Sequence, residues 1–162
     1  MDAPPLTPLA AAALHVSVPE RALVVECGEG DAVLLLAREF PAARVRGVDS
    51  SAERVRRASA RVGLDPEGRV AFKAGRPRGL PYPDGFFDLV AQVDGRPAPA
   101  EIARVLRAGG ELILVRTRPA RIAADARERL LRRGLKRHGI AAVEAGEAGN
   151  GKFFVGRLGS GR

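Results

Sequence analysis

Residues 23–37 read LVVECGEGDAVLLLA. The stretch opens with a short run of apolar residues that ends near Gly28 and Gly30, and an apolar segment without glycine or proline follows. A short continuous apolar run is typical of a parallel strand covered on both faces, and the two glycines allow the backbone to turn sharply. The stretch therefore predicts a strand at residues 22–27, a tight turn, and a helix at residues 31–40 that ends before Pro41.

The same alternation of strand and helix continues through the middle of the chain. Further strands are expected at residues 44–49, 69–74, 86–93 and 111–117. Helices are expected at residues 51–62, with Ser50 or Ser51 as the N-cap, and at residues 98–106, running up to the pair Gly109-Gly110. Alternating β and α units of this length predict a parallel, doubly wound sheet with right-handed crossovers.

The two ends of the chain differ from this middle part. A short helix is expected at residues 7–16, with Thr7 as its N-cap, and a long basic helix at residues 122–138. The turn-forming residues 149–151 lie between two strand-like segments, which is a hairpin signal. The predicted fold class is α/β: a Rossmann-like, doubly wound, mostly parallel sheet with a C-terminal antiparallel β-hairpin. We expect a single domain over residues 20–159, preceded by an N-terminal segment of residues 1–19.

The net charge of +8 raises the question of a polyanionic partner. Clustered Lys and Arg gain affinity for phosphates by releasing counterions, and residues 127–137 are rich in arginine. Arginine is nevertheless spread along the whole chain. An amphipathic helix with Leu130, Leu131 and Leu135 toward the sheet explains the basic stretch as well. Nucleic acid is therefore an alternative partner but not the favoured one.

The scarcity of cysteine and histidine excludes several kinds of site. The single cysteine, Cys27, excludes an internal disulfide, and with two histidines no Cys/His zinc site is expected. We expect no metal site and a reduced, cytoplasmic setting. The first residues lack a basic n-region, and no run approaches the ~18 apolar residues that spanning a bilayer requires. We therefore expect neither a signal peptide nor a membrane anchor.

Polar residues near the predicted carboxyl ends of strands are the candidates for ligand binding. Asp49 ends the second strand, where an acidic side chain can accept both hydroxyls of an adenosyl ribose; a helix N-cap is the alternative. Gln92 and Asp94 lie near the carboxyl end of the fourth strand, where ligands bind in open α/β sheets. Asp94 is the candidate general base, with a turn residue as the alternative. Asp88, at the opposite end of that strand, is expected to be structural.

Four segments resemble the successive signatures of class I S-adenosylmethionine (SAM)-dependent methyltransferases, in order and with matching spacing. They read LVVECGEGDAVLLLA, GVDSSAERVRRA, LPYPDGFFDLV and EIARVLRAGGELILV, and they cover roughly residues 20–117. The last segment is typical of small-molecule methyltransferases. A nicotinamide dehydrogenase is disfavoured, because Val33 stands where the third glycine of a dinucleotide-binding turn would be.

The resemblance implies a SAM cofactor at the first turn and transfer of its methyl group to an acceptor. The residues that would line the methionine part of SAM are Cys27, Gly28, Glu29 and Gly30. Asp49 would hold the ribose, with Ser50 beside it. In such enzymes the last strand usually runs antiparallel between its neighbours, which agrees with the predicted hairpin.

The sequence departs from the family pattern at three places. Val24 and Glu26 stand where the family has an acidic residue and a glycine, and Glu26 could replace the missing acid by reaching the SAM amino group. Arg76 stands where the family has an acid that accepts from the adenine amino group; Arg76 has no acceptor, but its plane can stack on adenine. Only residues 94–97 separate the fourth strand from the next helix, so little chain is left for an acceptor pocket.

Two hypotheses follow for the function. The leading one is a SAM-dependent methyltransferase with an unidentified acceptor, a small molecule or a protein, whose pocket a second copy or a protein partner completes. The other is a methyltransferase-like domain that has lost catalysis and serves as a binding or regulatory module.

Overall fold

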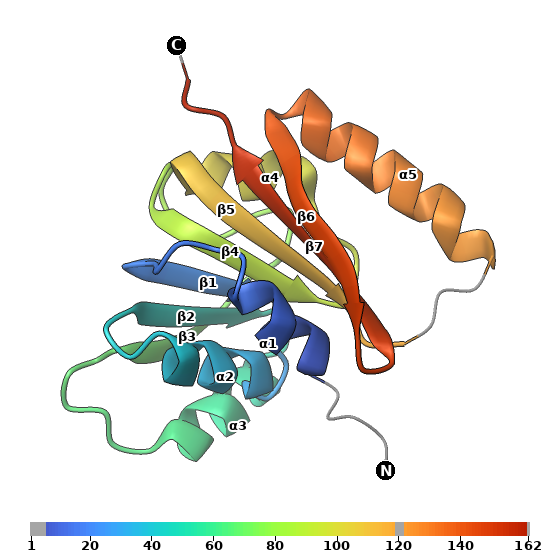
Figure 1. The fold of residues 1–162 in the computed structure, drawn as a ribbon. Coiled ribbons are helices and arrows are strands. Elements are labelled where there is room, and N and C mark those ends of the chain that lie inside the picture. Colours follow the sequence, from blue (N-terminus) through green and yellow to red (C-terminus); the bar gives the residue numbers. More distant parts are fainter. Residues whose placement is uncertain (1–5, 119–121, 162) are drawn as a thin grey trace.

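The structure, a computed structural model, describes residues 6–118 and 122–161. In chain order the elements are α1 (Thr7–Ala13), β1 (Arg21–Val25), α2 (Asp31–Glu39), β2 (Arg44–Asp49), α3 (Ala52–Val62), β3 (Val70–Ala74), β4 (Phe87–Val93), α4 (Pro99–Val105), β5 (Leu106–Arg116), α5 (Ile122–Arg137), β6 (Ile140–Ala148) and β7 (Gly151–Leu158). They form one α/β domain around a single mixed sheet (Figure 1). Residues 1–5 of the expected N-terminal segment lie outside the described residues.

The sheet confirms the predicted topology. Its seven strands lie in the order β3-β2-β1-β4-β5-β7-β6, and the pairs among β1 to β5 are parallel. Strand β7 runs antiparallel between β5 and β6, and the β6–β7 connection is the two-residue turn Gly149-Asn150. The expected hairpin is therefore present, and it places an antiparallel edge on an otherwise parallel sheet.

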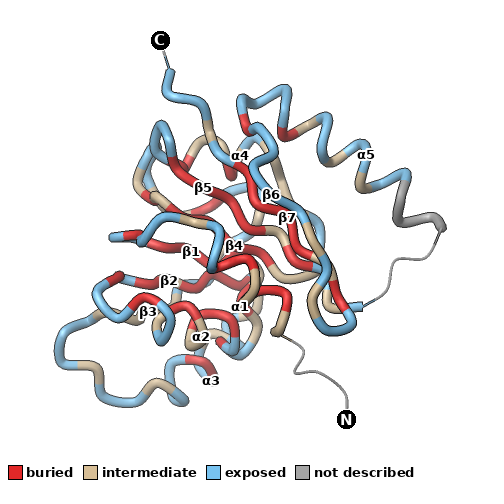
Figure 2. Tube along the Cα trace, in the orientation of Figure 1, coloured by how far each residue is buried: buried red, intermediate tan, exposed pale blue. Residues whose placement is uncertain are grey.

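Helices cover both faces of the sheet, which explains why the central strands are continuously apolar. In β1, Val24 packs into a core that includes residues of α1 and α2, whereas Leu23 and Val25 pack into a second core with residues of α4 and α5. Successive side chains of a strand point to opposite faces, so a strand buried on both sides needs apolar residues at every position. Figure 2 shows the central strands β1, β4 and β5 mostly buried, whereas the edge strand β6 and helix α5 are mostly exposed.

Three local expectations were wrong. Thr7 is the first helical residue, and Leu6 is the N-cap, without a side-chain hydrogen bond. The pair Gly109-Gly110 lies within β5 and not at the end of a helix, because the β4–β5 register shifts between Phe87 and Leu89 and the extra β5 residues bulge out. Gly109 takes a φ of 78° there, which glycine adopts without strain.

The third error concerns the basic helix α5. Leu135 is fully buried and Leu131 packs against the same core, but Leu130 is 67% exposed. Residues four apart lie on one helix face, and a neighbour in sequence is turned away by about 100°. The apolar stripe is thus narrower than expected. No helix of the described chain is both long and apolar enough to span a membrane.

The connection from β3 to β4, residues 75–86, contains no helix and is held by two side chains of α4, Arg104 and Glu101. The guanidinium of Arg104 donates to the carbonyls of Leu80 and Tyr82 and to the carboxylates of Asp84 and Glu101, over 2.6–3.0 Å. The Glu101 carboxylate in turn accepts from the Leu80 amide. This cluster fixes the loop onto α4 and closes the second core.

Candidate functional site

The carboxyl edge of the sheet brings the glycine turn and the end of β2 together. The Gly28 amide donates to Oδ2 of Asp49 over 2.9 Å, and the Cys27 amide donates to the Val48 carbonyl. The sequence distance between Gly28 and Asp49 is bridged because β1 and β2 are parallel neighbours in register, so both strands end at the same edge. The structure therefore brings together the glycine turn and Asp49, the two features on which the predicted cofactor site depends.

Asp49 is buried and holds three donors. Its Oδ1 accepts from the Ser51 amide and from Nε of Arg54, each over 2.9 Å, and its Oδ2 accepts from Gly28. Burial by itself raises the pKa of Asp49, but the Ser51 and Gly28 amides and the Arg54 guanidinium together hold that pKa below its usual value. The N-cap of α3 is Ser51, whose hydroxyl accepts from the Arg54 amide, so Asp49 is not the cap.

Gly28 and Gly30 are each required in the turn for a different structural reason. Both have positive φ, 55° at Gly28 and 95° at Gly30. A Cβ at Gly30 would lie only 3.0 Å from the Phe72 ring, so Gly30 is needed for packing. A Cβ at Gly28 would meet nothing within 4 Å, so the space over Gly28 is open. A ligand can therefore approach the backbone at Gly28.

The Cys27 side chain belongs to the core and not to the open side of the turn. It is buried in the same core as Val24, and a Cβ at Gly47 would lie 2.9 Å from its Sγ. Burial, and after it the nearby Asp49 carboxylate, raises the pKa of Cys27 to about 12. Within the turn, Cys27 can offer a ligand its backbone but not a reactive thiolate.

We expect this thiol to react with iodoacetamide more than about a hundredfold more slowly in the folded protein than in urea near pH 8, because the thiolate is the nucleophile. Mass spectrometry measures the rate directly, since Cys27 is the single cysteine. Equal rates in the folded and unfolded protein would show that the thiol is accessible and ionised.

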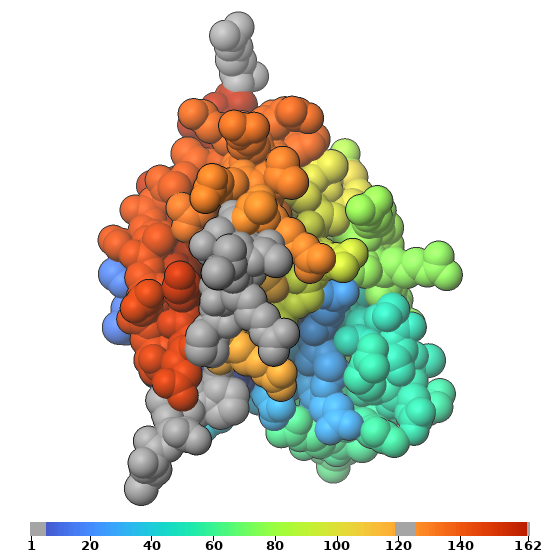
Figure 3. All heavy atoms as spheres, turned by 90° about the vertical axis from the view of Figure 1, so that its right-hand side faces the viewer, coloured from blue at the N-terminus to red at the C-terminus, as the bar shows by residue number. Residues whose placement is uncertain are grey.

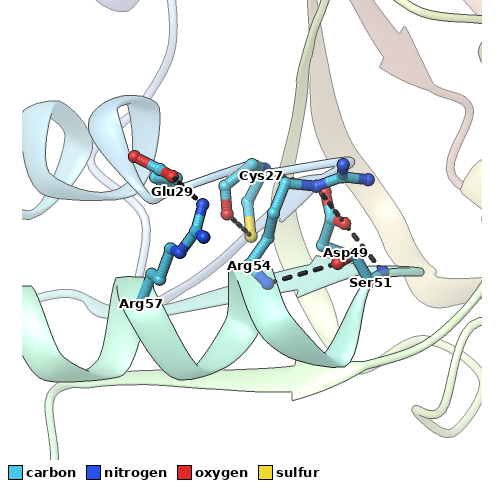
Figure 4. A network of polar contacts seen from close by, with 7 residues as sticks. Cys27, Glu29, Asp49, Ser51, Arg54 and Arg57 are labelled. Atoms are coloured by element: carbon cyan, nitrogen blue, oxygen red, sulfur yellow. Dashed lines mark hydrogen bonds and ion pairs between the residues drawn. The ribbon is translucent and has the colours of Figure 1, made fainter.

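Arginines of α3 line the outer side of the turn (Figure 4). Arg54 pairs with Asp49, Arg57 pairs with Glu29 at 3.2 Å, and Arg61 donates to the Glu29 carbonyl and pairs with Asp31 at 2.8 Å. The sequence interpretation missed this row. The spacing of three and four residues between these arginines puts them on one helix face, which was the available signal.

Glu26 occupies the position where a glycine was expected, and its backbone shows the consequence. Its φ is 53°, a left-handed conformation that costs a non-glycine residue roughly 1 kcal/mol. The Glu26 carboxylate accepts from Nε2 of Gln92 over 2.7 Å and lies directly against Gly95. Gln92 is 1% exposed, and its Oε1 has no hydrogen-bond partner among the residues that the structure describes. The Glu26 carboxylate after β1 thus lies beside the buried Gln92 amide of β4.

The geometry of Asp94 agrees with the turn interpretation. Both carboxylate oxygens accept from Thr117: Oδ1 from its amide over 3.0 Å and Oδ2 from its hydroxyl over 2.6 Å. The φ of Asp94 is 56°, as Asp tolerates in turns. The general-base assignment stays a prediction, and these bonds do not favour it. Asp88 fulfils the expected structural role, since its carboxylate accepts from the amides of Glu20 and Arg21 at the opposite edge.

Ser50 and Arg76 lie at the outer limit of the site. Both are exposed, and the structure gives neither side chain a hydrogen bond to a described residue. The Gly75 amide donates to the Asp49 carbonyl over 3.0 Å, so the loop that carries Arg76 starts beside Asp49. The stacking role expected for Arg76 remains a prediction.

Beyond Gln92 and Asp94 a groove runs between α5 and the β6–β7 hairpin. A small cavity of about 40 Å³ at the ends of β4 and β5 shares Glu128, Arg132, Lys152 and Phe153 with an open depression of about 430 Å³ on the hairpin. Figure 3 looks onto the molecular face where the hairpin, α5 and α3 come to the surface. The cavity reaches the carboxyl end of β4, since Gln92 and Asp94 are among its lining residues.

The strand order, the glycine turn facing Asp49 and the antiparallel last strand define a Rossmann-like α/β domain of the kind that binds nucleoside cofactors at its carboxyl edge. A family model described as a methyltransferase domain matches residues 22–110. The chain belongs to this methyltransferase family.

Individual relatives agree with the family match. The 27-O-demethylrifamycin SV methyltransferase of Amycolatopsis mediterranei is 33% identical over 133 residues, which are 75% of this chain and 48% of the relative. A SAM-dependent methyltransferase from Aquifex aeolicus has the same fold, with a TM-score of 0.75 and 18% identity over 97% of this chain and 94% of its own.

The fold is also shared with a protein of another activity. The [4+2]-cyclase SpnF has a TM-score of 0.76 and 21% identity, over 96% of this chain and 81% of its own. The curated relatives are longer, and the chain spans 36% to 48% of their length.

Proposed function

We propose that the chain binds SAM at the carboxyl edge of β1, β2 and β4 and transfers its methyl group to a small-molecule acceptor. One observation carries the proposal. In a chain of the methyltransferase family, the Gly28 amide donates to the Asp49 carboxylate, and the space over Gly28 is open to a ligand. A nucleoside cofactor needs close backbone approach and a ribose acceptor at this place, and the open space at Gly28 with the Asp49 carboxylate beside it supports this assignment.

The residues around the turn fit SAM. Asp49 would accept the ribose hydroxyls, with Ser50 beside it, and the backbone of residues 27–30 would contact the methionine part. The Glu26 carboxylate and the Oε1 of Gln92, which has no partner among the described residues, would accept from its ammonium group. Bound SAM supplies a methyl group on a positively charged sulfur, which an acceptor displaces in line. The protein has to position the two reactants, which is the larger part of catalysis for such a transfer.

The acceptor would bind in the groove between α5 and the hairpin. This groove begins at Gln92 and Asp94, the residues at the end of β4, and it contains Arg116, Arg132 and Lys152. Its small enclosed volume suits a ligand that stays partly exposed, or a pocket completed by a protein partner or a second copy. The relatives' names point to small-molecule acceptors, and the reaction would take place in the cytoplasm.

Arg54 competes with the ribose for Asp49 in this scheme. The Arg54 side chain is 49% exposed although Asp49 is buried, so the loss of this pair is expected to cost about 1 kcal/mol. We expect Arg54→Gln to tighten SAM binding about two- to fivefold, because the carboxylate is then free for the ribose. Calorimetric titration measures the change. Arg56→Gln, an equal charge change at an exposed position on the same helix, should leave the affinity unchanged. Weaker binding of Arg54→Gln would mean that Arg54 contacts SAM and does not compete with it.

The second hypothesis, a non-catalytic binding or regulatory module, has specific support. Both carboxylate oxygens of Asp94 accept from Thr117, and Arg54 is paired with Asp49, so neither acid is free of partners in this structure. The proposed activity and this alternative differ in their response to SAM.

Isothermal titration with SAM and S-adenosylhomocysteine at moderate salt tests the proposal, followed by detection of S-adenosylhomocysteine in the presence of candidate acceptors. Micromolar binding of both compounds supports the enzyme. No binding to correctly folded protein contradicts it and favours the module.

A further inference from the structure

The amino edge of the sheet, opposite the proposed cofactor site, carries a cavity of about 340 Å³ that no step of methyl transfer uses. Five residues line it: Arg21, Arg44, Arg46, Phe86 and Phe87. It lies where β1, β2 and β4 begin, at the left-hand edge of the sheet in Figure 1.

Strand register concentrates the three arginines on one sheet face. Arg21 and Arg44 are register partners at the first positions of β1 and β2, and Arg46 follows two residues later on the same side. This is the face on which Leu23 joins the core with α4 and α5. The 75–86 connection forms no helix, and its last residue, Phe86, is one of the residues that line the cavity.

These cations have no carboxylate partner within ion-pair distance among the described residues. Arg44 makes no side-chain hydrogen bond there, Arg46 donates only to the carbonyls of Val45, Gly68 and Arg69, and Arg21 lies over the Phe86 ring at 4.5 Å. The Asp88 carboxylate, which accepts from the backbone amides of Glu20 and Arg21, lies 3.6 Å from Arg107. Three unneutralised guanidinium groups around one hollow create a site for an anion.

We propose that this cavity binds a compact ligand that carries two or more phosphate groups. Guanidinium groups match phosphate oxygens in geometry, and three of them converge from two adjacent strands. The ligand is recognised by its phosphates and not by a base, because one face of Phe86 is covered by Arg21 and the ring also stacks with Tyr82. A hollow of this shape favours a small molecule over a nucleic-acid chain, which would need a longer basic track.

The test is calorimetric titration of the full chain with inorganic tripolyphosphate at about 0.15 M salt. The double variant Arg21→Gln with Arg44→Gln should bind about a hundredfold more weakly or not at all, since each of the two lost charge-assisted contacts costs roughly a factor of ten. The matched control is Arg38→Gln with Arg56→Gln, which removes the same charge from exposed positions on α2 and α3. This control should bind like the unaltered protein, and thermal unfolding shows whether both variants are folded.

Three results would overturn the proposal. The first is that tripolyphosphate does not bind the unaltered protein. The second is an equal loss of affinity in both double variants, which would mean that net charge alone causes binding. The third is binding of a single-stranded DNA of about 20 nucleotides without binding of tripolyphosphate, which indicates a nucleic-acid surface. Tripolyphosphate binding that leaves the SAM titration unchanged supports a site separate from the carboxyl edge.

Discussion

Replacing Arg104 by alanine is expected to lower the free energy of unfolding by about 3 kcal/mol. The side chain is two-thirds buried and donates to two carbonyls of the 75–86 loop and to two carboxylates. Its removal leaves the Leu80 and Tyr82 carbonyls without this donor and the Glu101 carboxylate without its counter-ion. Urea denaturation followed by circular dichroism measures the loss.

Arg107→Ala is the matched control, three residues further along the chain. Arg107 is 61% exposed and its contact with Asp88 is 3.6 Å long, so its loss should cost less than about 1 kcal/mol. Equal effects of the two substitutions would mean that the loop is not held by Arg104.

The same cluster predicts an acid sensitivity. The hydrogen bond from Arg104 holds the pKa of Glu101 below its ordinary value of 4.5. A lowered pKa in the folded state means that the stabilisation is complete above that ordinary value and is lost as the pH falls through the lower, folded value. We expect Glu101→Gln to reduce the loss of stability in this acid window, measured as the urea midpoint against pH. An unchanged pH profile would show that other carboxylates dominate acid unfolding.

Replacing Asp49 by alanine is expected to weaken SAM binding at least tenfold and to destabilise the fold by about 2–4 kcal/mol. The substitution removes the ribose acceptor and leaves the Gly28 and Ser51 amides and Arg54 without their shared partner. Calorimetry with SAM, at a temperature where the variant is folded, measures the first effect, and urea denaturation measures the second.

Two further variants show whether the effect of Asp49→Ala comes from the lost negative charge or from the position of that residue. Asp49→Asn keeps the volume and one acceptor oxygen, so it should fold better than the alanine variant but still bind SAM weakly. Glu53→Gln removes the same charge at a 63% exposed position on α3 and should change neither property. Normal SAM affinity of folded Asp49→Ala would place the pocket elsewhere, whatever its stability.

The sequence by itself determined the architecture, for a local reason. Strand β1 is apolar at successive positions and ends at Gly28 and Gly30, and this pattern repeats along the chain. Alternation of βα units predicted the parallel sheet, and the turn residues 149–151 between two strand-like segments predicted the C-terminal hairpin. The three errors are small: the helix boundary at Thr7, the bulge in β5 at Gly109 and the exposed position of Leu130 on α5. Each depends on contacts with distant parts of the chain.

Only the tertiary structure decided how the side chains of the site are used. Asp94 is engaged by Thr117, and Asp49 by Arg54 and two amides, and the sequence interpretation anticipated neither set of partners. The amino-edge cavity also depends on strand register, which brings Arg21 beside Arg44. These hydrogen bonds and charge clusters form between residues that are far apart in sequence. Apolar periodicity reports which face of a helix or strand is buried, but not which residues of another element lie opposite that face.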